Sequence, residues 1–160
     1  MNPVVPNNLV STKSFFNFPC AHRQWRHPGN CKLIHGYSRS FHFVFAAQTQ
    51  DACGFVVDFG GLDWLKAYLD RMFDHTMLLN PDDPLLQTFQ MLHEAGACEL
   101  RIMQYGVGME GTAQQVLEFA DENLRRQTKG RCWVISLEVC ENDKNSAVYY
   151  NPEPHFKGWT

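Results

Sequence analysis

The sequence lacks the features that mark membrane-spanning, secreted or nucleic-acid-binding proteins. No apolar run approaches the roughly 20 residues that a membrane-spanning helix needs. Residues 1–8 contain no basic segment followed by an apolar one, as a signal peptide would. The net charge of -3 argues against non-specific binding to nucleic acid or to an anionic membrane. These absences predict a cytoplasmic protein.

Disulfide and metal-binding cysteine patterns are also absent. The six cysteines are spread out, with no Cys-x-x-Cys pair, so free thiols are expected in a reducing compartment. A hydrophobic content of 44% with 19% charged residues is enough for a packed core. The length of 160 residues predicts a single domain over residues 1–160.

Hydrophobic periodicity predicts an α+β domain, with an antiparallel sheet backed by helices on one face. Residues 1–12 are interpreted as a loose arm. Thr112 is expected to be the N-cap of the longest helix, with Gln115 completing a capping box. The predicted strands are 13–22, 33–49, 55–59, 98–104, 132–141 and 147–150, and the other predicted helices are 62–73 and 84–95.

Glu141 follows apolar residues at every second position, so its carboxylate is expected on the apolar face of a strand. Those residues are Trp133, Ile135, Leu137 and Val139. A buried carboxylate without partners is costly. Two interpretations stay open: the side chain reaches water at the strand end, or it receives N–H donors from a bound heterocycle.

Further candidate groups cluster near the N-terminus. His22 and His35 are possible metal ligands, since a catalytic zinc takes about three protein ligands. Tyr37 shares a strand face with His35, and phenolate can bind metals. Cys31 is a possible nucleophile or base, because basic side chains near it in sequence would favour a thiolate. These side chains are Arg23, Arg26, His27 and Lys32. Each group also has an ordinary structural interpretation.

Asp74 and His75 are adjacent, and a neighbouring carboxylate can set the basicity and orientation of an imidazole. In isolation such a pair is more often a solvated surface feature.

Taken in order, these motifs resemble those of the 6-pyruvoyltetrahydropterin synthase and 6-carboxytetrahydropterin synthase family. The segments that carry the resemblance are Phe18-Pro-Cys-Ala-His22, Cys31-Lys-Leu-Ile-His35-Gly-Tyr37, Val56-Val57-Asp58-Phe59, Asp74-His75-Thr-Met-Leu-Leu-Asn80 and Glu141 through Tyr149. They cover roughly residues 14–80 and 110–150. Residues 82–108 match nothing in the pattern and are interpreted as an insertion that is atypical of the family.

The resemblance implies a tunnelling fold, in which four-stranded antiparallel sheets pair into barrels. Trimers or hexamers are implied, with active sites at subunit interfaces. The implied substrate is 7,8-dihydroneopterin triphosphate, and the product is 6-carboxytetrahydropterin, as in queuosine biosynthesis, or the 6-pyruvoyl compound. Zn²⁺ is implied on His22 and His35. Cys31 would move protons with Asp74 and His75 as its relay partner, and Glu141 would anchor the pterin.

Tyr37 stands where the family has a third histidine. Tyr37 itself, Cys20 or His27 would then complete the zinc site, or the site holds no metal. Gln115 likewise replaces a family glutamate. The alternative function is a pterin- or purine-binding homologue without catalysis. A third hypothesis is a metal-free thiol hydrolase that uses Cys31, His75 and Asp74.

Overall fold

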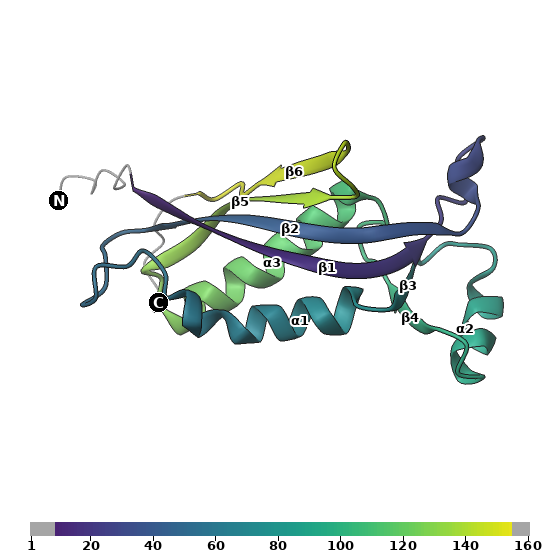
Figure 1. The fold of residues 1–160 in the computed structure, drawn as a ribbon, viewed down its shortest axis with the longest axis horizontal. Coiled ribbons are helices and arrows are strands. Elements are labelled where there is room, and N and C mark those ends of the chain that lie inside the picture. Colours follow the sequence, from purple (N-terminus) through teal and green to yellow (C-terminus); the bar gives the residue numbers. More distant parts are fainter. Residues whose placement is uncertain (1–8, 155–160) are drawn as a thin grey trace.

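The computed structural model describes residues 9–154, which form one long curled sheet with helices packed against it (Figure 1). The sheet has six strands in the order β4-β3-β1-β2-β5-β6. The strands are β1 (Val10–His22), β2 (His35–Ala47), β3 (Thr76–Leu79), β4 (Glu99–Ile102), β5 (Cys132–Cys140) and β6 (Ser146–Tyr150). The helices are α1 (Asp63–Phe73), α2 (Leu86–Glu94) and α3 (Met109–Gln127), with short 3-10 turns at Asn30–Lys32 and Phe59–Leu62.

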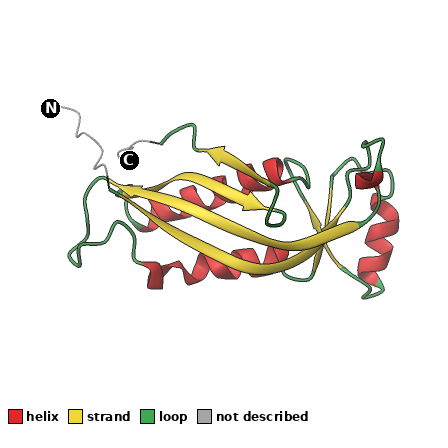
Figure 2. Cartoon of the chain, turned by 45° about the horizontal axis from the view of Figure 1, so that its top comes forward, coloured by secondary structure: helices red, strands yellow, loops and turns green. Residues whose placement is uncertain are grey.

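Helices α1 and α3 cover one face of the long strands, as Figures 1 and 2 show. Phe18, Phe41 and Phe43 point to this side and belong to the main core, together with Leu69 of α1 and Val116 of α3. A bulge in β1 between Phe15 and Phe18 shifts the register against β2. For this reason Phe15 is buried in the core, whereas Phe16 is 57% exposed, although alternation alone places Phe16 on the face of Phe18.

The prediction of a four-stranded antiparallel sheet is wrong in two respects. The observed sheet has six strands, and it is mixed, because β3 runs parallel to both β1 and β4. The prediction missed β3 and treated residues 74–81 as a loop. All four residues of β3 are buried, and such a strand reads as a short apolar run without alternation.

Helices do not lie on one face only. Leu78 of β3 belongs to the main core, whereas Met77 and Leu79 form a smaller cluster with Phe89 of α2. Alternate residues of a strand point to opposite faces, so α2 packs on the face of β3 that α1 and α3 leave open. The segment 82–108, expected to be atypical, therefore supplies α2 and edge strand β4, close to where helix and strand were predicted.

Three smaller expectations also need correction. Residues 55–59 form no strand, and the described part of the predicted arm, from Val10 onward, belongs to β1. Residues 1–8 lie outside the described part of the chain. Thr112 is buried within α3, whose N-cap is Gly108. The Thr112 hydroxyl accepts a hydrogen bond from Arg39, and the side chain of Gln115 accepts a hydrogen bond from Gln104 N–H.

No helix among residues 9–154 is long and apolar enough to cross a membrane.

Candidate functional site

Strand pairing brings the two candidate histidines together. His22 ends β1 and His35 begins β2, and the two are directly opposite in the antiparallel ladder. Their ring centroids are 4.5 Å apart. Glu141 directly follows β5 and joins them, because one donor atom from each of the three residues lies within 4.8 Å of the others. Among residues 9–154, this is the one group of histidine, cysteine and carboxylate side chains close enough to hold a metal ion.

The three side chains fit a divalent metal chemically. Two imidazoles and a carboxylate form a donor set that catalytic zinc sites use. Burial, followed by the charges of Arg39 and His35, lowers the pKa of His22 from 6.5 to about 3. His22 is therefore neutral at physiological pH, and neutral imidazole is the form that binds metals.

His22 should make folding stability depend on pH. Its folded pKa of about 3 lies below the unfolded value, so between these values the unfolded chain binds a proton that the folded chain does not. Stability is therefore lost as the pH falls, by about 2 kcal/mol between pH 7 and pH 5 from this group. The measurement is urea unfolding at both pH values for the wild type and His22→Asn, whose amide oxygen can still accept from Arg39. We expect the free energy of unfolding of the variant to depend less on pH by this amount. An equal pH dependence in both proteins would contradict the assignment.

Arg39 is a buried cation behind the histidines, with 1% of its surface exposed. Its guanidinium donates to Thr112 Oγ1 at 2.8 Å and to the Val107 carbonyl at 2.8 Å, and it lies 3.2 Å from His22 Nδ1. Sequence reasoning missed this residue. The signal was available, because Arg39 continues the face of β2 that carries Phe41, and a charge in such a stripe requires partners.

Cys31 shares a cavity with this group. The thiol is on the short 3-10 turn in the loop between β1 and β2. A cavity of about 270 Å³ is lined by His22, His35, Cys31 and Glu141, and also by residues at the start of α3. The thiol and the carboxylate, 110 positions apart in sequence, therefore open onto one space. The basic residues near Cys31 in sequence are partly engaged elsewhere: Arg23 and Arg26 pair with Asp83 and Asp82.

Asp74 and His75 form a pair, and His75 lines a different cavity of the same chain. His75 Nδ1 is 2.6 Å from Asp74 Oδ1, and the His75 side chain is 82% exposed. His75 also adopts a φ of +57°, and its backbone N–H donates to the Pro19 carbonyl at 2.7 Å. The cavity that His75 lines has a volume of about 570 Å³. His35 lines both cavities, so it stands between the thiol and this pair.

The residues considered as a third metal ligand lie in different places. Tyr37 is 49% exposed and lines the His75 cavity, as does the buried Cys20. Tyr37 also lies opposite Cys20 in the ladder between β1 and β2. His27 is in the Cys31 loop, where its Nδ1 accepts from Gly29 N–H at 2.9 Å. Neither Cys20 nor His27 belongs to the group formed by His22, His35 and Glu141.

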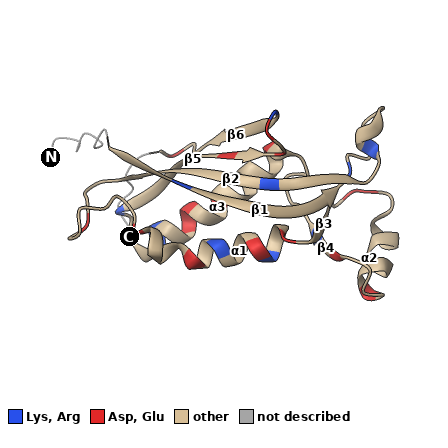
Figure 3. Cartoon of the chain, in the orientation of Figure 1, with Lys and Arg blue, Asp and Glu red and all other residues tan. Residues whose placement is uncertain are grey.

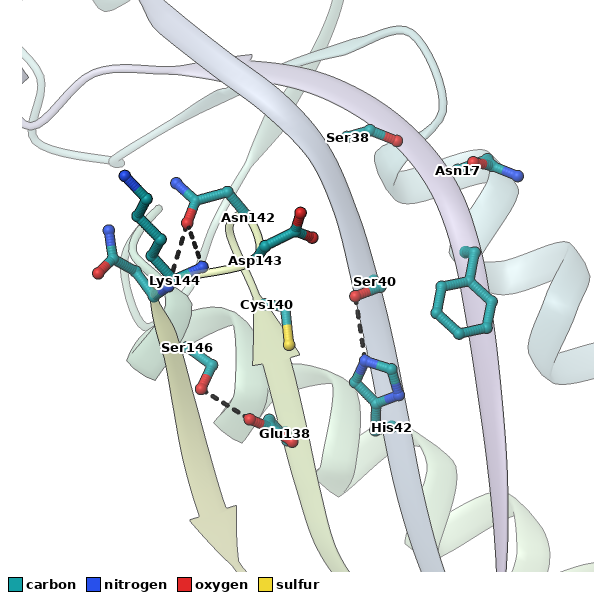
Figure 4. A pocket seen from close by; sticks show the side chains of 12 residues that line it. Asn17, Ser38, Ser40, His42, Glu138, Cys140, Asn142, Asp143, Lys144 and Ser146 are labelled. Carbon is teal, nitrogen blue, oxygen red and sulfur yellow. Dashed lines mark hydrogen bonds between the residues drawn. The ribbon is translucent and has the colours of Figure 1, made fainter.

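A third cavity, of about 380 Å³, lies on the sheet face away from α1 and α3. Figure 4 shows Ser38, Ser40 and His42 along β2 and Glu138 and Cys140 on β5. His42 is already bonded through both ring nitrogens, to Ser14 at 2.7 Å and Ser40 at 3.1 Å. Figure 3 shows acidic and basic residues mixed along α1 and α3 and little charge on the strands.

Solved structures of other proteins share the fold of this chain. In fold, the chain is similar to an uncharacterized protein from Wolinella succinogenes, with a TM-score of 0.75 and 21% identity over 90% of this chain and 99% of that one. It is also similar to 6-pyruvoyltetrahydropterin synthase from Plasmodium vivax, with a TM-score of 0.61 and 14% identity over the same shares. The architecture is thus the tunnelling fold in its coarse form, a curled mixed sheet with helices.

The family follows from the sequence match. The family model described as 6-pyruvoyl tetrahydropterin synthase matches residues 11–152, and the chain belongs to this family. 6-carboxy-5,6,7,8-tetrahydropterin synthase from Rickettsia conorii is 36% identical over 76 residues, which is 47% of this chain and 55% of that protein. The Rickettsia typhi protein of the same name is 35% identical over the same shares. The chain thus matches about half the length of these curated relatives.

Proposed function

We propose that the protein is a lyase that converts 7,8-dihydroneopterin triphosphate to 6-carboxy-5,6,7,8-tetrahydropterin, as in a queuosine-type pathway, or to the related 6-pyruvoyl product. One observation carries the proposal: a thiol, two imidazoles and a carboxylate, from Cys31, His22, His35 and Glu141, line one cavity. Family membership over residues 11–152 supports the reaction class. The names of the partial relatives favour the 6-carboxy product. A cytoplasmic location is proposed with it.

Zn²⁺ is the proposed metal. His22 and His35 would hold it, with Glu141 within reach and Tyr37 next on the same face of β2. When bound, zinc would act as a Lewis acid and polarise hydroxyl groups of the substrate side chain. A carboxylate at Glu141 offers two acceptor oxygens, which suit the adjacent N–H groups of the aminopyrimidine edge of a pterin.

Cys31 is proposed to take and return a proton at Sγ. Asp74 accepts the N–H of His75 Nδ1 at 2.6 Å, which orients the ring and leaves Nε2 to exchange a proton. In one chain His75 and Cys31 line different cavities. We therefore propose a homo-oligomer, a trimer or hexamer, in which the relay pair of one protomer completes the site of another.

Glu141→Gln separates substrate binding from metal binding. We expect the affinity for a dihydropterin to fall about 10- to 150-fold, since a charge-assisted hydrogen bond contributes about 1.5–3 kcal/mol. Bound metal should be retained, because His22 and His35 remain. Fluorescence titration and elemental analysis on the same samples measure the two quantities, with Glu138→Gln as a control on the other face of β5. Loss of the metal with the pterin affinity would instead make Glu141 a metal ligand.

The test of the function is incubation of pure protein with dihydroneopterin triphosphate and added zinc, with pterin products separated by chromatography. The expected result is consumption of substrate with release of triphosphate and of a tetrahydropterin. Acetaldehyde identifies the 6-carboxy branch. Absence of turnover in the zinc-supplied protein would contradict the lyase.

A second candidate function is a metal-free pterin-binding protein, and Arg39 is the observation that favours it. A guanidinium has no acceptor, so its contact with His22 Nδ1 requires that nitrogen to accept. The non-ligating nitrogen of a metal-bound histidine usually donates instead. Elemental analysis of protein purified without an affinity tag discriminates the two functions. Tight pterin binding with no metal would favour the second, and about one zinc per chain the first.

A further inference from the structure

We propose that Asp83 is a positioning residue for the Cys31 thiol: through Arg23, it fixes the loop of residues 23–34 over the proposed active-site cavity. This role rests on the proposed function, in which Cys31 moves a proton. Asp83 belongs to the segment 82–108, for which the sequence suggested no role.

The contact between Asp83 and Arg23 is bidentate and buried. Arg23 Nε donates to Asp83 Oδ2 at 2.7 Å, and Nη2 donates to Oδ1 at 2.8 Å. The Asp83 side chain is 0% exposed and the Arg23 side chain 15% exposed. Leu85 N–H also donates to Asp83 Oδ1 at 2.8 Å, so the carboxylate is itself held in place. Paired, charge-assisted bonds of this kind fix orientation as well as distance, and burial protects them from screening by salt.

Arg23 connects Asp83 to both ends of the loop. It directly follows His22, and its Nη1 donates to the carbonyl of Lys32 at 3.3 Å. Gln24 N–H donates to the Cys31 carbonyl at 2.8 Å, which closes the loop on itself. The backbone of Cys31 is thus bonded to the residue beside Arg23, and a change at Asp83 has a short path to the thiol.

A second, exposed set of contacts provides a matched control. Asp82 accepts a hydrogen bond from Trp25 Nε1 at 3.3 Å and pairs with Arg26. The Arg26 and Asp82 side chains are 69% and 47% exposed, and exposed ion pairs contribute little to stability. Asp82 and Asp83 are adjacent and contact the same loop, but only the Asp83 pair is buried. The same substitution, aspartate to asparagine, is therefore expected to have different effects at the two positions.

The electrostatics agree with a permanently charged Asp83. Burial would raise the pKa of this carboxyl, but hydrogen bonds from Arg23 and Leu85 N–H, together with the charge of Arg23, outweigh it and lower the pKa. The pair is therefore present throughout the neutral range and weakens only as the pH falls through this lowered value.

The experiment compares Asp83→Asn, Asp82→Asn and Arg23→Lys with the wild type. Hydrogen exchange by mass spectrometry is expected to speed up on the order of tenfold for peptides covering residues 24–33 in Asp83→Asn. Arg23→Lys, which keeps one bond, should be intermediate, and Asp82→Asn should match the wild type. Equal acceleration across α3 and β5 would mean that Asp83 supports the whole fold, and this would overturn the proposal.

Thiol alkylation reports on Cys31 without any assay of turnover. Cys31 and Cys53 are both exposed, and Cys53 is in a remote turn, so Cys53 is an internal reference for a free thiol. The ratio of their iodoacetamide rates should move toward one in Asp83→Asn and stay at the wild-type value in Asp82→Asn. A ratio that Asp83→Asn leaves unchanged, or one already near one in the wild type, would overturn the proposal.

Kinetics separates this role from the proposed function itself. With dihydroneopterin triphosphate, Asp83→Asn should lower kcat on the order of tenfold at constant KM, because Glu141 follows β5 and is not part of the loop. A rise in KM at constant kcat would overturn the positioning role. Absence of turnover in the wild type would instead contradict the lyase, while exchange and alkylation would still decide whether Asp83 positions Cys31.

Discussion

Replacement of Cys31 by alanine should lower kcat by about 10²–10⁴-fold, the usual contribution of a positioned proton-transfer group. The substitution should be tolerated by the fold, since Cys31 is exposed and lies outside the main core. The affinity for the pterin should change little, because Glu141 is untouched. Single-turnover kinetics with dihydroneopterin triphosphate measures the effect, with thermal unfolding as the check on folding.

Cys53→Ala is the matched control for this prediction, because Cys53 is also exposed but lies in the turn after β2, at the end of that strand opposite to His35 and the cavity (Figure 1). It should retain wild-type kinetics. If Cys31→Ala turned over at the wild-type rate, another group would have to move the proton, and the lyase mechanism proposed for this cavity would be wrong in its central residue.

Arg39→Met should lower the free energy of unfolding by about 1–3 kcal/mol, the cost of leaving buried hydrogen-bond acceptors without a donor. Methionine fills part of the volume of the side chain but leaves Thr112, Val107 and His22 without their donor. Urea unfolding monitored by tryptophan fluorescence measures the loss. A further consequence concerns the metal, since removal of the guanidinium frees His22 Nδ1 and should raise zinc affinity.

Two variants test whether burial is the cause. Arg126→Met removes an exposed guanidinium that pairs with Glu122, with side chains 58% and 67% exposed, and should cost less than about 1 kcal/mol. Arg39→Lys keeps the charge but not the planar guanidinium group. Its free energy of unfolding should lie between those of the wild type and Arg39→Met. If Arg39→Met were as stable as the wild type, the buried network would contribute no net stability.

Most elements could be predicted from the sequence because their signals are local. The alternation in β2, the helical spacing in α1 and the hairpin of β5 and β6 are visible in the order of residues, and the structure contains these elements. The free cysteines are likewise found in the structure. Family membership was also visible, because five short motifs in order are specific even where each one is common.

Strand β3 and the bulge in β1 were not predictable in the same way. Thr76–Leu79 is a strand because β1 and β4 bind it on both edges, and pairing with distant residues leaves no local pattern. The bulge between Phe15 and Phe18 moves one phenylalanine to the core and another to the surface, and strict alternation cannot reveal it.

By itself the sequence determined which reactive groups this protein has and the family to which it belongs, since both depend on residue identity and order. Only the tertiary structure decided which of those groups meet. His22 and His35 are opposite because β1 and β2 pair in one register, and Glu141 joins them because β5 lies on the other side of β2. The burial of Arg39 and Asp83 was decided there too, because a charged side chain leaves water only where distant partners are already in place.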